Sequence, residues 1–128
     1  MSEIELIRRC YERIVAADFP HAAQDDEREA VKGVRVRGCH GNTQNVLFFT
    51  LTLEDGQLRD VRYDCQYCEP AMYITAEVLC ELLEDRPLGL LAELDDAAVI
   101  GALGGESRKI LRQARTAVEL LGEALAGA

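Results

Sequence analysis

Two cysteines three residues apart, Cys65 and Cys68, are the side chains of this chain best suited to chemistry. They fall between an expected strand and an expected helix. Pro70 suits the first turn of that helix, because proline has no N–H to satisfy and its φ is already helical. Cys68 would then lie just ahead of unpaired helix N–H groups, whose partial positive charge favours the thiolate. Such a thiolate could bind metal or attack sulfur, although redox, zinc and iron–sulfur sites all use this spacing.

A second pair of candidate residues, Cys39 and His40, lies between two glycines in an expected loop. In a three-stranded meander, the loop between strands one and two lies at the same edge of the sheet as the end of strand three. We therefore expect Cys39, His40, Cys65 and Cys68 to converge. Three thiolates and an imidazole are soft donors suited to zinc or to an iron–sulfur cluster.

Three other residues of these types are expected to be inert. Cys10 falls on the apolar stripe of an amphipathic helix, and Cys80 lies inside a second helix, so both are predicted to be core residues. His21 follows Pro20 in a charged stretch without a nearby ligand in sequence. We predict that it lies at the surface.

The composition bounds the class of protein. With 128 residues the chain is expected to form one domain, 1–128, and 48% hydrophobic with 29% charged residues is typical of a soluble globular protein. A net charge of −9 argues against a nucleic-acid partner, and no apolar run is long enough to span a membrane. The first residues lack the pattern of a secretory signal, so a cytoplasmic location is expected, where disulfides are rare and thiols stay reduced.

The elements that must position these residues follow from hydrophobic periodicity. Apolar residues recur at helical spacing near both ends of the chain, and alternate at strand spacing in between. The turn Glu54-Asp55-Gly56 favours a hairpin, because Asp-Gly readily adopts positive φ. The fold class predicted is α+β: an N-terminal helix, a three-stranded antiparallel sheet, then helices packed on one face. The expected helices are 2–17, 70–85, 93–103 and 107–125; the strands are 33–37, 46–54 and 58–64; residues 18–30 and 38–42 are a linker and a loop.

This order of elements, with three segments in particular, resembles the NifU/IscU-type iron–sulfur cluster assembly scaffolds. The segments are Leu53-Glu-Asp-Gly-Gln-Leu-Arg-Asp-Val-Arg-Tyr63, the Tyr67-Cys68 junction, and Leu79-Cys-Glu-Leu-Leu-Glu-Asp-Arg-Pro-Leu88. The resemblance covers about residues 33 to 125 in order and length, and is specific from about 47 to 88. It implies the IscU/SufE-like fold.

The resemblance also implies a role for individual residues. The second cluster cysteine of the family corresponds to Cys68, and the first lies in the loop that holds Cys39, offset by about three residues. The third ligand position falls near Lys109-Ile110, where no thiol exists, so Cys65 or His40 would have to replace it. The implied cofactor is an iron–sulfur cluster (2Fe-2S) or zinc. The implied partners are a cysteine desulfurase, which supplies sulfur, and recipient apo-proteins or a chaperone. The chain itself is expected to have no enzymatic activity.

Two alternatives stay open. Val36-Arg37-Gly38-Cys39 reproduces the Val-x-Gly-Cys loop of SufE, a sulfur acceptor of the same fold, so that Cys39 would accept a persulfide without metal. The second alternative is that the chain is a degenerate family member, which acts as an interaction module and has only structural thiols. A thiol–disulfide oxidoreductase is less favoured, because its CxxC follows the first strand of a thioredoxin-type unit, not the third strand of a meander.

Overall fold

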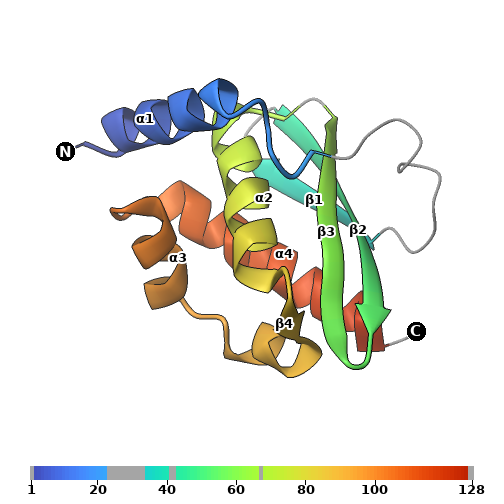
Figure 1. Cartoon of the computed structure of the whole chain (residues 1–128). Helices are drawn as coiled ribbons and strands as arrows, with labels where there is room; N and C mark the ends of the chain where they lie inside the picture. Colours follow the sequence, from blue (N-terminus) through green and yellow to red (C-terminus); the bar gives the residue numbers. More distant parts are fainter. Residues whose placement is uncertain (1, 23–33, 41–42, 67, 127–128) are drawn as a thin grey trace.

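The computed structural model describes residues 2–22, 34–40, 43–66 and 68–126 (Figure 1). Within these ranges, the side chains of 34–40, 43–48, 66, 120 and 123–126 are outside the description. The helices and strands lie in the order that the sequence predicts. In chain order they are α1 (Glu3–Ala16), β1 (Val34–His40), β2 (Thr43–Glu54), β3 (Gln57–Gln66), α2 (Pro70–Leu83), β4 (Arg86–Pro87), the 3₁₀ helix η1 (Leu88–Glu93), α3 (Asp96–Leu103) and α4 (Arg108–Ala126).

The sheet is antiparallel, with strand order β1-β2-β3-β4. The α+β class is therefore confirmed, as an N-terminal helix, a meander and a helical half. The short edge strand β4 adds to the three predicted strands: Leu58 pairs with Arg86, and Gln57 with Pro87. Proline at this place fits an edge strand, where no ladder N–H is required of it.

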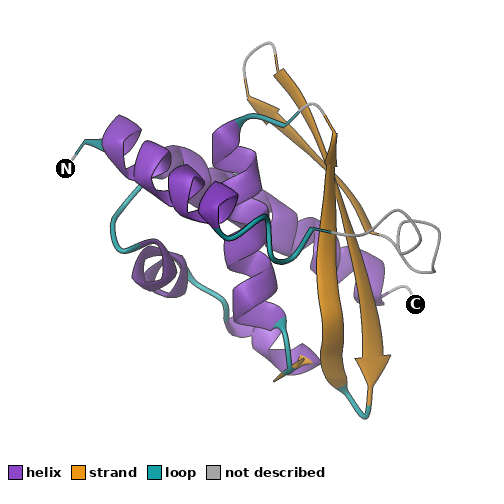
Figure 2. Cartoon of the chain, turned by 45° about the horizontal axis from the view of Figure 1, so that its top comes forward, coloured by secondary structure: helices purple, strands orange, loops and turns teal. Residues whose placement is uncertain are grey.

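The helices lie on one side of the sheet, as Figure 2 shows. Helix α2 contacts β3, α4 contacts β1, and α1 packs on α2. Helix α2 is buried on almost every side and forms the centre of the core. Its buried residues are Ala71, Met72, Ile74, Thr75, Ala76, Glu77, Val78, Leu79, Cys80 and Leu83.

Local signals account for the ends of several elements. The Ser2 hydroxyl accepts a hydrogen bond from the Glu5 N–H and so caps α1. Asp55 and Gly56 have φ of 53° and 77°, which confirms the predicted hairpin turn between β2 and β3. The helix predicted from residue 93 begins instead at Asp96, because Asp95 caps it by accepting from the Ala98 N–H, and η1 precedes it.

Gly104 ends α3 with a φ of 78°, a left-handed conformation that a side chain disfavours. We expect Gly104→Ala to lower the free energy of unfolding by about 1–2 kcal/mol, from backbone strain alone, since an added Cβ would meet no atom within 4 Å. Gly101→Ala, in open space within the same helix, is the matched control and should raise it by about 0.5–1 kcal/mol. Urea unfolding measures both, and equal effects would contradict the assignment.

Candidate functional site

Cys65 and Cys68 flank the junction between β3 and α2, as the sequence predicts. Cys65 is the second-last residue of β3, opposite Leu47 of β2, and Cys68 precedes the helix N-cap Glu69. Both cysteines are half-buried. They are joined by a disulfide, with their Cα atoms 5.7 Å apart. The expectation of reduced thiols thus differs from the structure: the three-residue spacing brings the two sulfurs together closely enough to bond.

The start of α2 is held against α4 by a polar network around Glu69. One carboxylate oxygen of Glu69 accepts from the Gln113 amide at 2.9 Å, and the other is 2.8 Å from the Lys109 ammonium. The Gln113 carbonyl oxygen in turn accepts from the Thr75 hydroxyl at 2.9 Å, deep in the core. The resemblance implies a third ligand near Lys109-Ile110, where neither side chain is a thiol. The network brings Lys109 beside the helix start that follows Cys68, with its ammonium bonded to Glu69.

Gln113 links the buried Thr75 hydroxyl to the half-buried Glu69 carboxylate, so replacing it should lower the stability of the fold. We expect Gln113→Ala to lower the free energy of unfolding by about 1–3 kcal/mol, because it removes a donor from Glu69 and leaves a gap beside Thr75. Arg112→Ala, at the exposed neighbouring position of α4, should change it by less than about 0.5 kcal/mol. Thermal or urea unfolding distinguishes the two, and an equally mild Gln113→Ala would show that the network adds little.

Cys39 and His40 are the last two residues of β1, paired with Gln44 and Thr43. The prediction that residues 38–40 belong to a loop is therefore wrong, because their backbone is part of β1. Cross-strand hydrogen bonds to β2 extend the strand through Gly38, whose low strand propensity suggested an interruption. The side chains of Cys39 and His40 lie outside the described part of the chain.

The register places Cys39 at the same end of the sheet as Cys65, but not in the same row. Leu47 pairs with Cys65 on one side and with Val36 on the other, so Cys39 lies three residues further along β1. With about 3.3 Å per residue and 4.8 Å between strands, the Cα atoms of Cys39 and Cys65 are roughly 14 Å apart on a flat sheet. The register between β2 and β3 ends at the Val46–Gln66 pair, so it includes Cys65 but does not extend to Cys68. The Cα atoms of Cys65 and Cys68 are 5.7 Å apart, where a continuous strand would separate them by about 10 Å, so the chain turns after β3.

The described side chains form no complete metal site by themselves. Among them, with Cys39 and His40 left out, no three histidine, cysteine, aspartate or glutamate side chains are placed to hold an ion. Cys65 and Cys68 supply two sulfur atoms of a donor set, and they are available as ligands only when the disulfide is reduced. The convergence of the four predicted ligands stays a prediction.

His21 is not the surface residue that the sequence suggested. Its imidazole is 13% exposed and lies between a carboxylate of α2 and that of the helix C-cap: Nδ1 is 2.8 Å from Glu77 and Nε2 is 3.0 Å from Glu84. The His21 N–H also donates to Glu77, and its carbonyl accepts from the Tyr63 N–H. The segment before residue 23 is therefore fastened to both α2 and β3. No local pattern pointed to this, because Glu77 and Glu84 are more than 50 residues away in the chain.

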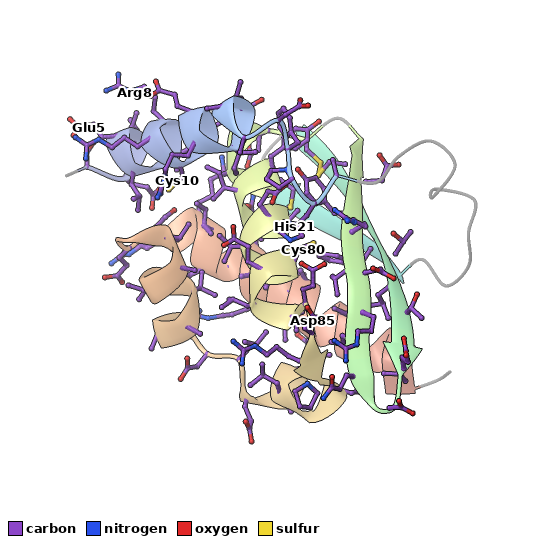
Figure 3. The ribbon with its side chains drawn as sticks, in the orientation of Figure 1. Glu5, Arg8, Cys10, His21, Cys80 and Asp85 are labelled. Atoms are coloured by element: carbon purple, nitrogen blue, oxygen red, sulfur yellow. A yellow bond between two sulfur atoms is a disulfide. The ribbon has the colours of Figure 1, made fainter. Side chains whose placement is uncertain are left out.

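The electrostatics of this cluster favour a charged imidazole. Burial would lower the pKa of His21, but the hydrogen bonds and charges of Glu77 and Glu84 outweigh it and raise the pKa above 6.5. The Glu77 charge also acts on Tyr63 and on Cys80. Figure 3 labels Cys80 and His21 beside helix α2. Burial, followed by the Glu77 charge, raises the pKa of the Tyr63 hydroxyl and of the Cys80 thiol, so both stay neutral. These environments disfavour a reactive thiol at Cys80, in line with its predicted packing role.

Cys10 is also a core residue, as predicted, at 4% exposure. Its thiol donates to the Leu103 carbonyl at 3.6 Å and lies 3.0 Å from the Arg13 guanidinium, which also donates to Leu103. This small arrangement ties α1 to the end of α3. Among the cysteines whose side chains the structure describes, Cys10 and Cys80 are free.

Comparison with known proteins adds no family assignment. No protein-family model and no curated protein matches this sequence. Among the helices that the structure describes, none combines the length and apolar character needed to cross a membrane.

Proposed function

We propose that this protein is a scaffold of iron–sulfur cluster assembly that holds a cluster or zinc through cysteines at one end of its sheet. The observation that carries the proposal is the position of Cys65 and Cys68, at the junction of β3 with the buried helix α2. Two half-buried sulfurs beside a fixed helix start can hold a metal ion and still be reached from solvent. A scaffold needs both properties, because its cargo must leave.

The proposed ligands are Cys65 and Cys68, with Cys39 and His40 from the end of β1. Thiolate and imidazole are the donors that zinc and iron–sulfur clusters accept. Cys39 in β1 and the end of β3 that leads to Cys68 lie at the same end of the sheet, which supports their use in one site. The cluster is cargo: sulfur would come from a cysteine desulfurase, and the assembled cluster would pass to recipient apo-proteins. In this proposal the protein is a carrier in the cytoplasm, not an enzyme.

A sulfur acceptor is the second candidate, and the Cys65–Cys68 disulfide favours it. With those two sulfurs bonded to each other, Cys39 could still act as the acceptor. Its thiolate would attack the outer sulfur of a desulfurase persulfide, form a new S–S bond and release the desulfurase thiolate. No metal takes part in that step.

Anaerobic purification under reducing conditions tests the scaffold proposal. The protein is reconstituted with ferrous iron and sulfide, or with zinc, and freed of excess. Visible absorbance together with bound iron, zinc and sulfide should then show about one cluster or one zinc ion per chain. If the protein stays colourless and metal-free but takes up a persulfide sulfur at Cys39, the result would contradict the scaffold proposal and support the sulfur acceptor. If the protein binds no metal and accepts no persulfide sulfur, both proposals are contradicted and the interaction module is the remaining alternative.

A further inference from the structure

We propose that Cys65 and Cys68 form a reversible dithiol–disulfide couple that gates loading of the metal site, so that the oxidised pair excludes the cargo and the reduced pair accepts it. This inference rests on the proposed function and adds a redox control to the same site. It also assigns an exchange partner by chemistry: a dithiol reductant.

The backbone around the pair suits both states. Cys65 is held in β3 by its pairing with Leu47, and Cys68 leads directly into α2, whose N-cap Glu69 is bonded to Lys109 and Gln113. None of these contacts uses a sulfur atom. Opening the disulfide therefore breaks none of these contacts, which hold the two ends of the turn.

The change from disulfide to metal ligand is small in geometric terms. Bonded sulfurs lie about 2.05 Å apart. Two thiolates on a tetrahedral zinc, each about 2.3 Å from the ion, lie about 3.8 Å apart. A Cα separation of 5.7 Å lies within the range of disulfides and is short enough for both sulfurs to reach one ion. Rotation of the two side chains separates the sulfurs without moving the strand or the helix.

Exposure confines exchange to this pair among the described cysteines. Cys65 and Cys68 are half-buried, whereas Cys10 and Cys80 are 4% and 0% exposed. An incoming thiolate can therefore reach the disulfide, while the two core thiols are shielded by packing.

The chemistry of the gate balances with a dithiol as the reductant. One thiolate of the reductant attacks a sulfur of the disulfide and forms a mixed disulfide, which releases the other cysteine. The second thiol of the reductant then displaces it. Two electrons and two protons have moved to Cys65 and Cys68, and the reductant has become a disulfide. A low-molecular-weight disulfide such as oxidised glutathione drives the reverse reaction.

The experiment compares the full chain in its two redox states. One sample is oxidised with oxidised glutathione and the other is reduced with dithiothreitol, and both are desalted anaerobically. Alkylation after denaturation, read by mass, should find two more thiols per chain in the reduced sample. Titration with zinc against a chromophoric chelator should show binding at least tenfold weaker in the oxidised sample, and reduction should restore it.

Two variants make the outcomes decisive. Cys10→Ala, a core cysteine outside the pair, should gate as the parent does. Cys68→Ser cannot form the bond within the chain, so oxidised glutathione should give Cys65 only as a free thiol or as a mixed disulfide that carries the mass of one glutathione. Equal zinc binding in the two states, or a pair that never oxidises, overturns the gate and leaves the scaffold intact. A pair that cycles in a protein that binds neither zinc nor cluster when reduced overturns the scaffold, and the gate with it.

Discussion

Replacing Cys68 with alanine is expected to abolish cluster binding and to weaken zinc binding by at least 100-fold under reducing conditions. Cys68 belongs to every proposed donor set: it is bonded to Cys65 across the turn and directly precedes the N-cap of α2. Removal of one thiolate from a four-ligand site leaves an ion that three donors hold poorly. Metal analysis after anaerobic reconstitution measures the loss.

Cys10→Ala and Cys80→Ala are the controls for that measurement. Both residues are buried in the core, and neither lies at the β3–α2 junction. They should lower the free energy of unfolding but leave the amount of bound metal unchanged. Full metal content in the Cys68→Ala protein would rule out the proposed ligand set. Loss of metal in the Cys10→Ala protein, if it remains folded, would do the same by showing that the site lies elsewhere.

The elements near the site were predictable because their signals are local. Asp55-Gly56 specifies a hairpin turn through positive φ, Ser2 caps α1 through its own hydroxyl, and Pro70 marks the first turn of α2. Each depends on a few neighbouring residues. The cysteine pair at the end of β3 follows from two of these signals, since it lies between a returning strand and a helix start.

The features that the sequence did not reveal depend on contacts between distant residues. Strand β4 exists because Arg86 and Pro87 pair with the β2–β3 hairpin, not because of their own propensity. The extension of β1 through Cys39 comes from its partner strand. The environment of His21 is set by Glu77 of α2, which lies 56 residues further along the chain. Redox state follows from distance in space, so three-residue spacing allowed the Cys65–Cys68 disulfide without specifying it.

Glu77→Ala is expected to produce the largest loss of stability, about 3 kcal/mol, or a fall in Tm of roughly 10 °C. Glu77 is 3% exposed and bonds both the ring and the backbone N–H of His21. Without it, a buried imidazolium keeps one partner, Glu84, and a backbone donor is left unpaired. Glu81→Ala, at an exposed position of the same helix, should shift Tm by less than about 2 °C. Similar shifts for the two variants would show that the cluster is not what fastens residue 21 to α2.

The pH dependence of stability isolates the contribution of His21 itself. Its pKa is raised in the folded state above the value of about 6.5 expected for the unfolded chain, so the native state holds the proton more tightly. The stability this provides is fully present below pH 6.5 and is lost as pH rises through the raised folded pKa. The difference in unfolding free energy between the parent and His21→Gln should therefore be largest near pH 6 and shrink towards pH 9. The groups that face the imidazole are the carboxylates of Glu77 and Glu84. Beside them, Tyr63 and Cys80 stay neutral over that window, because burial and then the Glu77 charge raise their pKa values. A difference that does not change with pH would mean that neutral His21 serves the fold equally well, and that the two carboxylates hold it by hydrogen bonding alone.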